Sequence, residues 1–256
     1  MSVLPSTTAN CMASAVRSPA PERETFQNFF ECWLVEQNQH LQELIAASQQ
    51  HHSTADDDSL CSLIKRVLEH YEHYYKAKAR WGKEDVLAML SPAWTSTFED
   101  AFLWIGGWRP IMAFHLLYFK SGLQLEDQLN ELIRGMGRGD LGDLSPCQLS
   151  RIDELQAKTI KEEKEVTEKM AKHQETVADS SMLELNHLVS GNDEERGWGR
   201  CGSGEGESAM ECKEEGLKEM LQRADDLRLR TLKAVIDILT PIQAVHFLIA
   251  AAPKDS

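Results

Sequence analysis

The sequence predicts an all-α protein, a multi-helix bundle with one long helix at about residues 146–189 and a flexible glycine-rich loop after it. Apolar residues recur at the spacing of amphipathic helices over most of the chain, and no convincing segment alternates as a strand does. Residues 147–189 contain no proline or glycine, which permits a helix of roughly 40 residues, about 60 Å long. At 256 residues, 42% of them hydrophobic, the chain can bury a real core.

The order of elements follows from the same periodicity. Residues 1–24 are small and polar, so we expect a disordered tail, then one helical domain over 25–252 and a short tail over 253–256. A polar loop is expected at 49–59, and a flexible internal loop at 191–215, which begins with a glycine-rich, charged stretch. Besides the long helix, helices are predicted over 24–45, 60–75, 83–90, 217–239 and 244–252.

Three helix starts carry a capping-box pattern, in which Ser or Thr is followed three residues later by Glu or Gln. The pattern occurs at 96–99, 145–148 and 240–243. In the last two, Pro146 and Pro241 occupy the first helical position, which proline favours. Each of these prolines also ends whatever helix precedes it, because proline restricts the residue before it.

One apolar stretch, AFLWIGGWRPIMAFHLLYF at residues 101–119, is about as long as a membrane-spanning helix. Arg109 and Pro110 lie near its centre, where a charge and a helix break are most costly in a membrane. We therefore expect no membrane span. We predict instead two buried helices that meet at a corner over residues 106–110.

The candidate site residues are Trp104, Trp108 and Arg109 at this corner. A guanidinium within an apolar run must be paired or stacked, since a lone buried charge is very costly, and Glu99 or Asp100 is the expected partner. The residues have two interpretations. They form a structural corner, or they bind a partner, because Trp and Arg are the commonest hot-spot residues of interfaces.

Charge and cysteine content limit the class of protein. The net charge of −14 and the pI of about 5.1 disfavour direct binding to DNA and to anionic membranes. The six cysteines form no C-x-x-C pair, so we expect free thiols in a reducing compartment. The first 21 residues show no secretory signal. Together these features predict a protein of the nucleus, the cytoplasm or both.

Two short motifs have simple explanations. The G-x-G-x-x-G at 197–202 lacks the preceding strand that a dinucleotide site requires, and we assign it to the glycine-rich loop. The Arg-Gly-Asp tripeptide at 138–140 lies in a glycine-rich stretch, and we interpret it as part of a tight turn. No known catalytic motif is present, so we expect no enzyme activity.

Histidines raise the question of a metal or cofactor. Glu69 and His70, with Glu72 and His73 three residues later, place imidazoles and carboxylates in pairs that are close enough on a helix to share a divalent metal ion. No third fixed ligand is identifiable, so we interpret them as the polar flank of an amphipathic helix. His115 and His246 lie within apolar runs, and we expect both to be core histidines. No metal and no cofactor are predicted.

Six segments of the sequence resemble the plant delay-of-germination domain. They are FFECWL at 29–34, AFLWIGGWRP at 101–110, FHLLY at 114–118, GDLGDLSP at 139–146, KMAKHQETVAD at 169–179 and LTPIQAVHFL at 239–248. The resemblance covers about residues 25–252 and is strongest for seed-dormancy-like members. Their domain is shared with the C-terminal half of plant TGA-type bZIP transcription factors.

The resemblance implies a helical, non-enzymatic regulator. Dormancy-type members are implied to act in abscisic-acid signalling through type 2C protein phosphatases, which makes an adaptor working by protein–protein contacts the leading hypothesis. The alternative is a regulator of DNA-templated transcription, with transcription factors as partners. Whether the chain forms a homo-oligomer is open.

Two properties of the family are not expected here. In the transcription factors a basic region precedes the domain and contacts DNA, whereas Arg17 and Arg23 are the only basic residues before residue 25. Sequence-specific DNA binding is therefore not carried over. Some dormancy-type members bind haem through C-terminal histidines, but residues 253–256 read PKDS, so haem binding is not carried over either.

Overall fold

The computed structural model describes residues 26–50, 57–92, 94, 103–132, 144–189 and 205–252. Within these residues every regular element is a helix, which confirms the all-α prediction. The predicted tails at 1–24 and 253–256 lie outside the described residues, as do the short motifs at 138–140 and 197–202. None of the helices described is long and apolar enough to span a membrane.

The described helices follow the periodic stretches of the sequence. They are α2 (Phe26–Gln50), α3 (Asp57–Glu84), α4 (Val86–Leu90), α6 (Ile111–Leu132), α7 (Pro146–Val189), α8 (Glu205–Ile238) and α9 (Pro241–Ala251). The single short helix expected at 83–90 is wrong in its start, because α3 continues to Glu84. Asp85 then caps α4 by accepting a hydrogen bond from the N–H of Ala88 at 2.9 Å.

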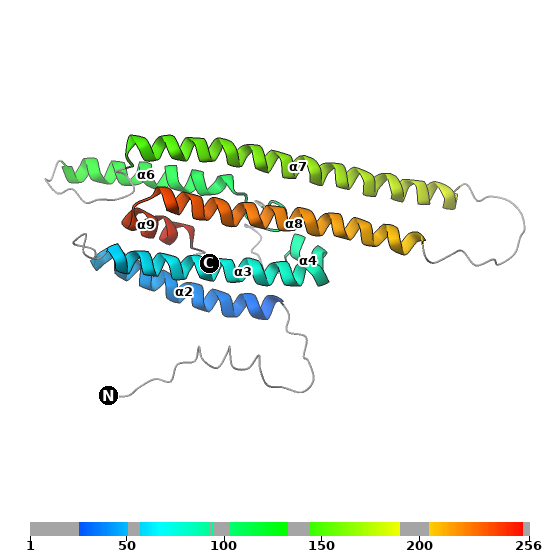
Figure 1. Ribbon diagram of the computed structural model, residues 1–256, viewed down its shortest axis with the longest axis horizontal. Coiled ribbons are helices and arrows are strands. Elements are labelled where there is room, and N and C mark those ends of the chain that lie inside the picture. Colours follow the sequence, from blue (N-terminus) through cyan, green and yellow to red (C-terminus); the bar gives the residue numbers. More distant parts are fainter. Residues whose placement is uncertain are drawn as a thin grey trace, which may run out of the picture.

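The helices form three layers (Figure 1). α6 and α7 lie on one side, α8 and α9 in the middle, and α2 and α3 on the other side. α7 and α8 run antiparallel and extend together beyond the rest of the bundle. Because α8 contacts α3 and α4 on one side and α6 and α7 on the other, a polar side chain that it buries against these helices needs partners from the protein.

The main hydrophobic core surrounds α9. Phe247 and Leu248 of α9, Val67 of α3 and Phe114 of α6 are each 1% exposed or less. Burial of such a side chain contributes about 1.5–3 kcal/mol. A smaller cluster of aromatic and apolar residues lies around Phe26 at the start of α2. The larger part of the hydrophobic contribution to folding stability therefore comes from the core around α9.

Two of the predicted capping boxes are confirmed, and they contact each other. Ser145 and Gln148 exchange side chain to backbone hydrogen bonds at the start of α7, at 3.2 and 2.9 Å. Thr240 and Gln243 do the same at the start of α9. The Gln148 amide also donates to Gln243 Oε1 at 2.8 Å. The third predicted box, at 96–99, lies outside the described residues.

The flexible loop predicted at 191–215 is wrong over its last part, because α8 begins at Glu205. Gly216, just after the predicted loop, lies within α8 for a packing reason. A Cβ at this position would lie 2.3 Å from the His173 ring of α7. His173 Nε2 is 2.8 Å from the carbonyl oxygen of Lys213, so the glycine lets α7 approach α8 closely.

This packing role of Gly216 predicts a contrast between two helical glycines. Gly122 of α6 has no atom within 4 Å of its position for a Cβ. Gly122→Ala should therefore raise the free energy of unfolding by about 0.5–1 kcal/mol, the helix-propensity difference. Gly216→Ala should gain nothing, because the methyl group displaces His173 from Lys213. Urea unfolding measures both, and an equal stabilisation by the two substitutions would contradict the packing role.

Candidate functional site: the Trp104–Arg109 segment and the ionic cluster behind it

Residues 104–107 form a tight turn. The Trp104 N–H donates to the Gly107 carbonyl at 2.8 Å, and the Gly107 N–H donates back to the Trp104 carbonyl at 3.2 Å. Ile105 and Gly106 between them have φ angles of 44° and 69°, the positive signs of a type I′ turn. Two successive positive φ angles cannot occur in a right-handed helix. The first of the two helices predicted at the corner is therefore wrong for residues 103–105, whereas the second is α6.

The two glycines of the turn are required by close contacts. A Cβ on Gly106 would lie 2.5 Å from the carbonyl oxygen of Met89, and one on Gly107 would lie 3.0 Å from the guanidinium carbon of Arg228. Ile105, in contrast, has a positive φ with a branched side chain, which costs on the order of 1–3 kcal/mol. The surrounding structure has to offset this cost.

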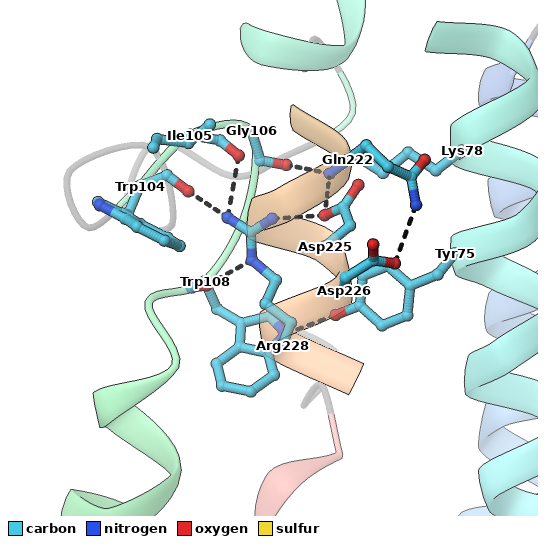
Figure 2. Close-up of polar contacts among 10 residues, drawn as sticks. All are labelled: Tyr75, Lys78, Trp104, Ile105, Gly106, Trp108, Gln222, Asp225, Asp226 and Arg228. Carbon is cyan, nitrogen blue, oxygen red and sulfur yellow. Dashed lines mark hydrogen bonds and ion pairs between the residues drawn. The ribbon is translucent and has the colours of Figure 1, made fainter. Parts of the chain in front are cut away.

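The Arg228 side chain extends from α8 to the turn and binds its backbone carbonyl groups from the interior of the bundle (Figure 2). Its guanidinium donates to the carbonyl oxygens of Trp104, Ile105 and Trp108, the last two at 2.9 and 2.6 Å. Lys78 of α3 donates to a fourth carbonyl oxygen, that of Gly106, at 2.6 Å. The two buried cations, Arg228 and Lys78, thus bind the backbone carbonyl groups of residues 104, 105, 106 and 108.

Asp225 supplies the negative charge of this ionic cluster, which we define as Lys78, Asp225 and Arg228. Its carboxylate oxygen lies 3.0 Å from Lys78 Nζ and also accepts from Arg228 Nη1. The three side chains are 1–4% exposed. Burial lowers the pKa of Lys78 to about 8, and the charge of Asp225 opposes this shift. The amino group of Lys78 is therefore mostly protonated at neutral pH.

The two tryptophans of the segment are anchored by their indole N–H groups. Trp104 donates to Thr167 Oγ1 of α7 at 3.1 Å, and the Arg228 guanidinium lies 5.3 Å from the centre of its ring. Trp108 donates to the Tyr75 hydroxyl of α3 at 2.9 Å. Burial raises the pKa of Tyr75 well above its ordinary value, so this acceptor stays neutral. The Trp108 residue remains 37% exposed.

Arg109 is paired, as the sequence indicates, but its partner is Glu163 of α7. Arg109 Nε lies 2.8 Å from Glu163 Oε2, while Glu163 Oε1 accepts from the N–H of Ile111 at the start of α6 at 2.6 Å. The Arg109 side chain is 52% exposed and the Glu163 side chain 2%. The expectation of a buried guanidinium at Arg109 is therefore wrong, and the proposed partners at 99 and 100 lie outside the described residues.

The cluster itself presents no reactive group to solvent. Its ammonium, carboxylate and guanidinium groups are enclosed and all bind other groups of the protein. The most exposed side chains of the segment are those of Trp108 and Arg109, whereas those of Trp104 and Ile105 are only partly exposed. The segment is thus a rigid piece of backbone, held from inside, with an aromatic and a cationic side chain at the surface.

The other candidate histidines do not gather at this segment. His115 is exposed on α6 and His246 partly exposed on α9, so the expectation that both are core residues is wrong. His115 follows Phe114, whose side chain takes the buried face of α6. On α3 His70 is buried whereas Glu69 and His73 are exposed, so these residues do not form one polar flank. No group of three His, Cys, Asp or Glu side chains in the described residues could hold a metal.

The sequence patterns did not single out Lys78, Asp225 or Arg228. A signal was nevertheless present, because each occupies a core position of an amphipathic helix. Asp225 and Arg228 fall between the buried Leu221 and Leu232 of α8, in the apolar stripe. A charged residue in such a stripe requires a buried partner.

Comparison with known proteins identifies the family. The sequence model described as "DOG1: Seed dormancy control" matches residues 40–119, which include α3, α4 and the Trp104–Arg109 segment. Protein DOG1-like 4 of Arabidopsis thaliana is 33% identical over 235 residues, covering 90% of this chain and 88% of the relative. The chain belongs to the DOG1-like family. This confirms the resemblance to the delay-of-germination domain.

Two further relatives of this DOG1-like chain show how far the domain extends. Protein DOG1-like 3 of Arabidopsis thaliana is 29% identical over 225 residues, covering 85% of this chain and 77% of the relative. Transcription factor TGA2 of the same plant is 30% identical over 219 residues, covering 85% of this chain and 57% of TGA2. None of these names describes an enzyme. Family membership supports a regulator of the seed-dormancy type.

Arg109 and Arg230 provide a matched pair of substitutions. Both make an ion pair with α7, Arg109 with the buried Glu163 and Arg230 with the more exposed Glu162. Arg109→Ala should lower the free energy of unfolding by about 1–3 kcal/mol, because it leaves a buried carboxylate short of a donor. Arg230→Ala should change it by about 0.5 kcal/mol or less. Equal effects in thermal or urea unfolding would show that the Glu163 carboxylate does not depend on Arg109.

Proposed function

We propose that this DOG1-like chain is a non-enzymatic regulatory adaptor of the seed-dormancy type, acting by protein–protein contacts in abscisic-acid and dormancy signalling. Family membership supports the regulatory role. The proposed place of action is the nucleus, the cytoplasm or both. The observation that carries the contact mechanism is the Trp104–Arg109 segment, a fixed backbone that presents Trp108 and Arg109 to solvent.

The geometry of the segment favours recognition of a protein. Trp and Arg are the residues most often found as hot spots of interfaces. The backbone carbonyl groups are already bound by Arg228 and Lys78, so little conformational entropy is lost when a partner binds. Arg109 keeps about half of its side chain exposed while Glu163 orients it. A planar guanidinium held in this way suits a carboxylate of the partner.

The proposed partners are type 2C protein phosphatases, which the family resemblance implies, or transcription factors. Pull-down from seed extract with mass spectrometry, followed by titration of a purified phosphatase, tests the proposal. Trp108→Ala and Arg109→Lys should each weaken binding at least tenfold. Arg109→Lys keeps the charge beside Glu163, so its melting temperature should stay close to that of the wild type.

Two matched controls complete this experiment. Leu87 of α4 is an exposed apolar residue, 59% exposed, and Leu87→Ala should leave binding unchanged. Arg230→Lys, the same chemical change at the neighbouring ion pair, should leave it unchanged as well. If Arg109→Lys and Trp108→Ala bind like the wild type, the segment is no interface and has only a structural role.

Relatedness to TGA2 favours a second candidate, a regulator of transcription that acts in the nucleus. Such a role would use a DNA-bound partner, because a net charge of −14 opposes phosphate contacts. We predict no sequence-specific DNA binding by this chain alone. A gel shift with site preference that survives competitor DNA would contradict this. A shift that appears only when a transcription factor is added would favour the second candidate.

A further inference from the structure

A second polar site lies between α2 and α3, away from the Trp104–Arg109 segment. Four buried side-chain atoms in the described residues have no hydrogen-bond partner, all of them on α2 or α3, and three of the four can carry a free lone pair. They are Gln37 Oε1, His40 Nδ1 and His70 Nε2. An amide oxygen and an unprotonated imidazole nitrogen each carry a lone pair, so all three atoms are ready to bind an electrophile.

The geometry of the two imidazoles fits a shared ion. The ring centres of His40 and His70 are 5.1 Å apart. A transition-metal ion lies about 2.0–2.1 Å from a histidine nitrogen, which places it about 3.2 Å from the ring centre. Two histidines at a tetrahedral angle then have ring centres about 5 Å apart. The observed separation agrees with this value.

His70 shares one feature with metal-binding histidines, a carboxylate near its second ring nitrogen. Glu36 Oε2 lies 3.5 Å from Nδ1, the Trp33 backbone forms a hydrogen bond with the ring, and Nε2 has no partner. A carboxylate at the second nitrogen is the usual companion of a histidine that binds a metal, because it fixes the tautomer. Trp33 stacks on the same ring, with centres 4.7 Å apart and planes 3° from parallel, and fixes its orientation.

Charge and protonation agree with cation binding. The groups that act on His40 are the carboxylates of Glu36 and Glu43 and the guanidinium of Arg66, which pairs with Glu43 at 2.6 Å. Burial lowers the pKa of His70 to about 4 and also lowers the pKa of His40. Burial thus favours the neutral form of each ring.

We infer that His40 and His70 form a binding site for a divalent transition-metal ion of the imidazole-preferring class, with Gln37 Oε1 as an additional oxygen ligand and Glu36 as the group that orients His70. Water completes the coordination. His40 is partly exposed as a residue, although its Nδ1 is enclosed. The ion would join α2 to α3.

Titration of the untagged chain with Zn²⁺ at pH 7.5, followed by calorimetry, tests the site. We expect one ion per chain. His40→Gln should weaken binding at least tenfold, and Glu36→Gln should weaken it by about 10–100-fold through the orientation of His70. His70→Gln should abolish binding, but this substitution is in the core, so His40→Gln is the decisive variant. Circular dichroism checks that each variant remains folded.

Two controls separate this site from other histidines. His73→Gln changes an exposed histidine of α3, and a chain with both His51→Gln and His52→Gln lacks the adjacent histidine pair. Both should bind Zn²⁺ like the wild type. Spin resonance of the Cu²⁺-loaded chain should show coupling to two imidazole nitrogens. The inference is overturned if no saturable binding occurs, if His40→Gln binds normally, or if the 51–52 variant loses the site.

Discussion

Two buried cations in the middle layer of a helical bundle constrain the rest of the candidate site. Arg228 cannot reach water, because α8 is covered on both sides, and Asp225 alone cannot satisfy both Arg228 and Lys78. The remaining donors need further acceptors, and carbonyl groups that take no part in a helix are fully available for this role. A segment that turns back on itself supplies them, and its four inward carbonyl groups bind the two cations.

The same constraint explains why the segment has an unfavourable backbone. A positive φ at Ile105 costs on the order of 1–3 kcal/mol, whereas each hydrogen bond to a charged group contributes about 1.5–3 kcal/mol. The bonds to Arg228 therefore offset the strain. Glu163 then fixes the start of α6 by accepting from Ile111 and Arg109. Through these contacts one short segment connects α3, α6, α7 and α8, and it leaves Trp108 and Arg109 at the surface.

The sequence allowed the helices and two capping boxes to be predicted, because both depend on residues close together in the chain. Ser145 with Gln148 is an example, and the proline after each cap adds a second local signal. The ionic cluster depends instead on residues 147 positions apart, Lys78 and Asp225, so no local pattern identifies the pairing. Arg109 drew attention because its charge stands in an apolar run. The same reasoning applied to Arg228 in the stripe of α8 would have located the buried guanidinium.

The dependence of the turn on Arg228 is tested most directly by amide hydrogen exchange of the Trp104 and Gly107 N–H groups in Arg228→Met, with Arg230→Met as the exposed control. The account predicts that Arg228→Met loses on the order of 3–5 kcal/mol of unfolding free energy. It also predicts that the two amides exchange much faster while the amides of α9 stay protected. The control should match the wild type. Unchanged stability together with unchanged protection of Trp104 and Gly107 in Arg228→Met would contradict the account.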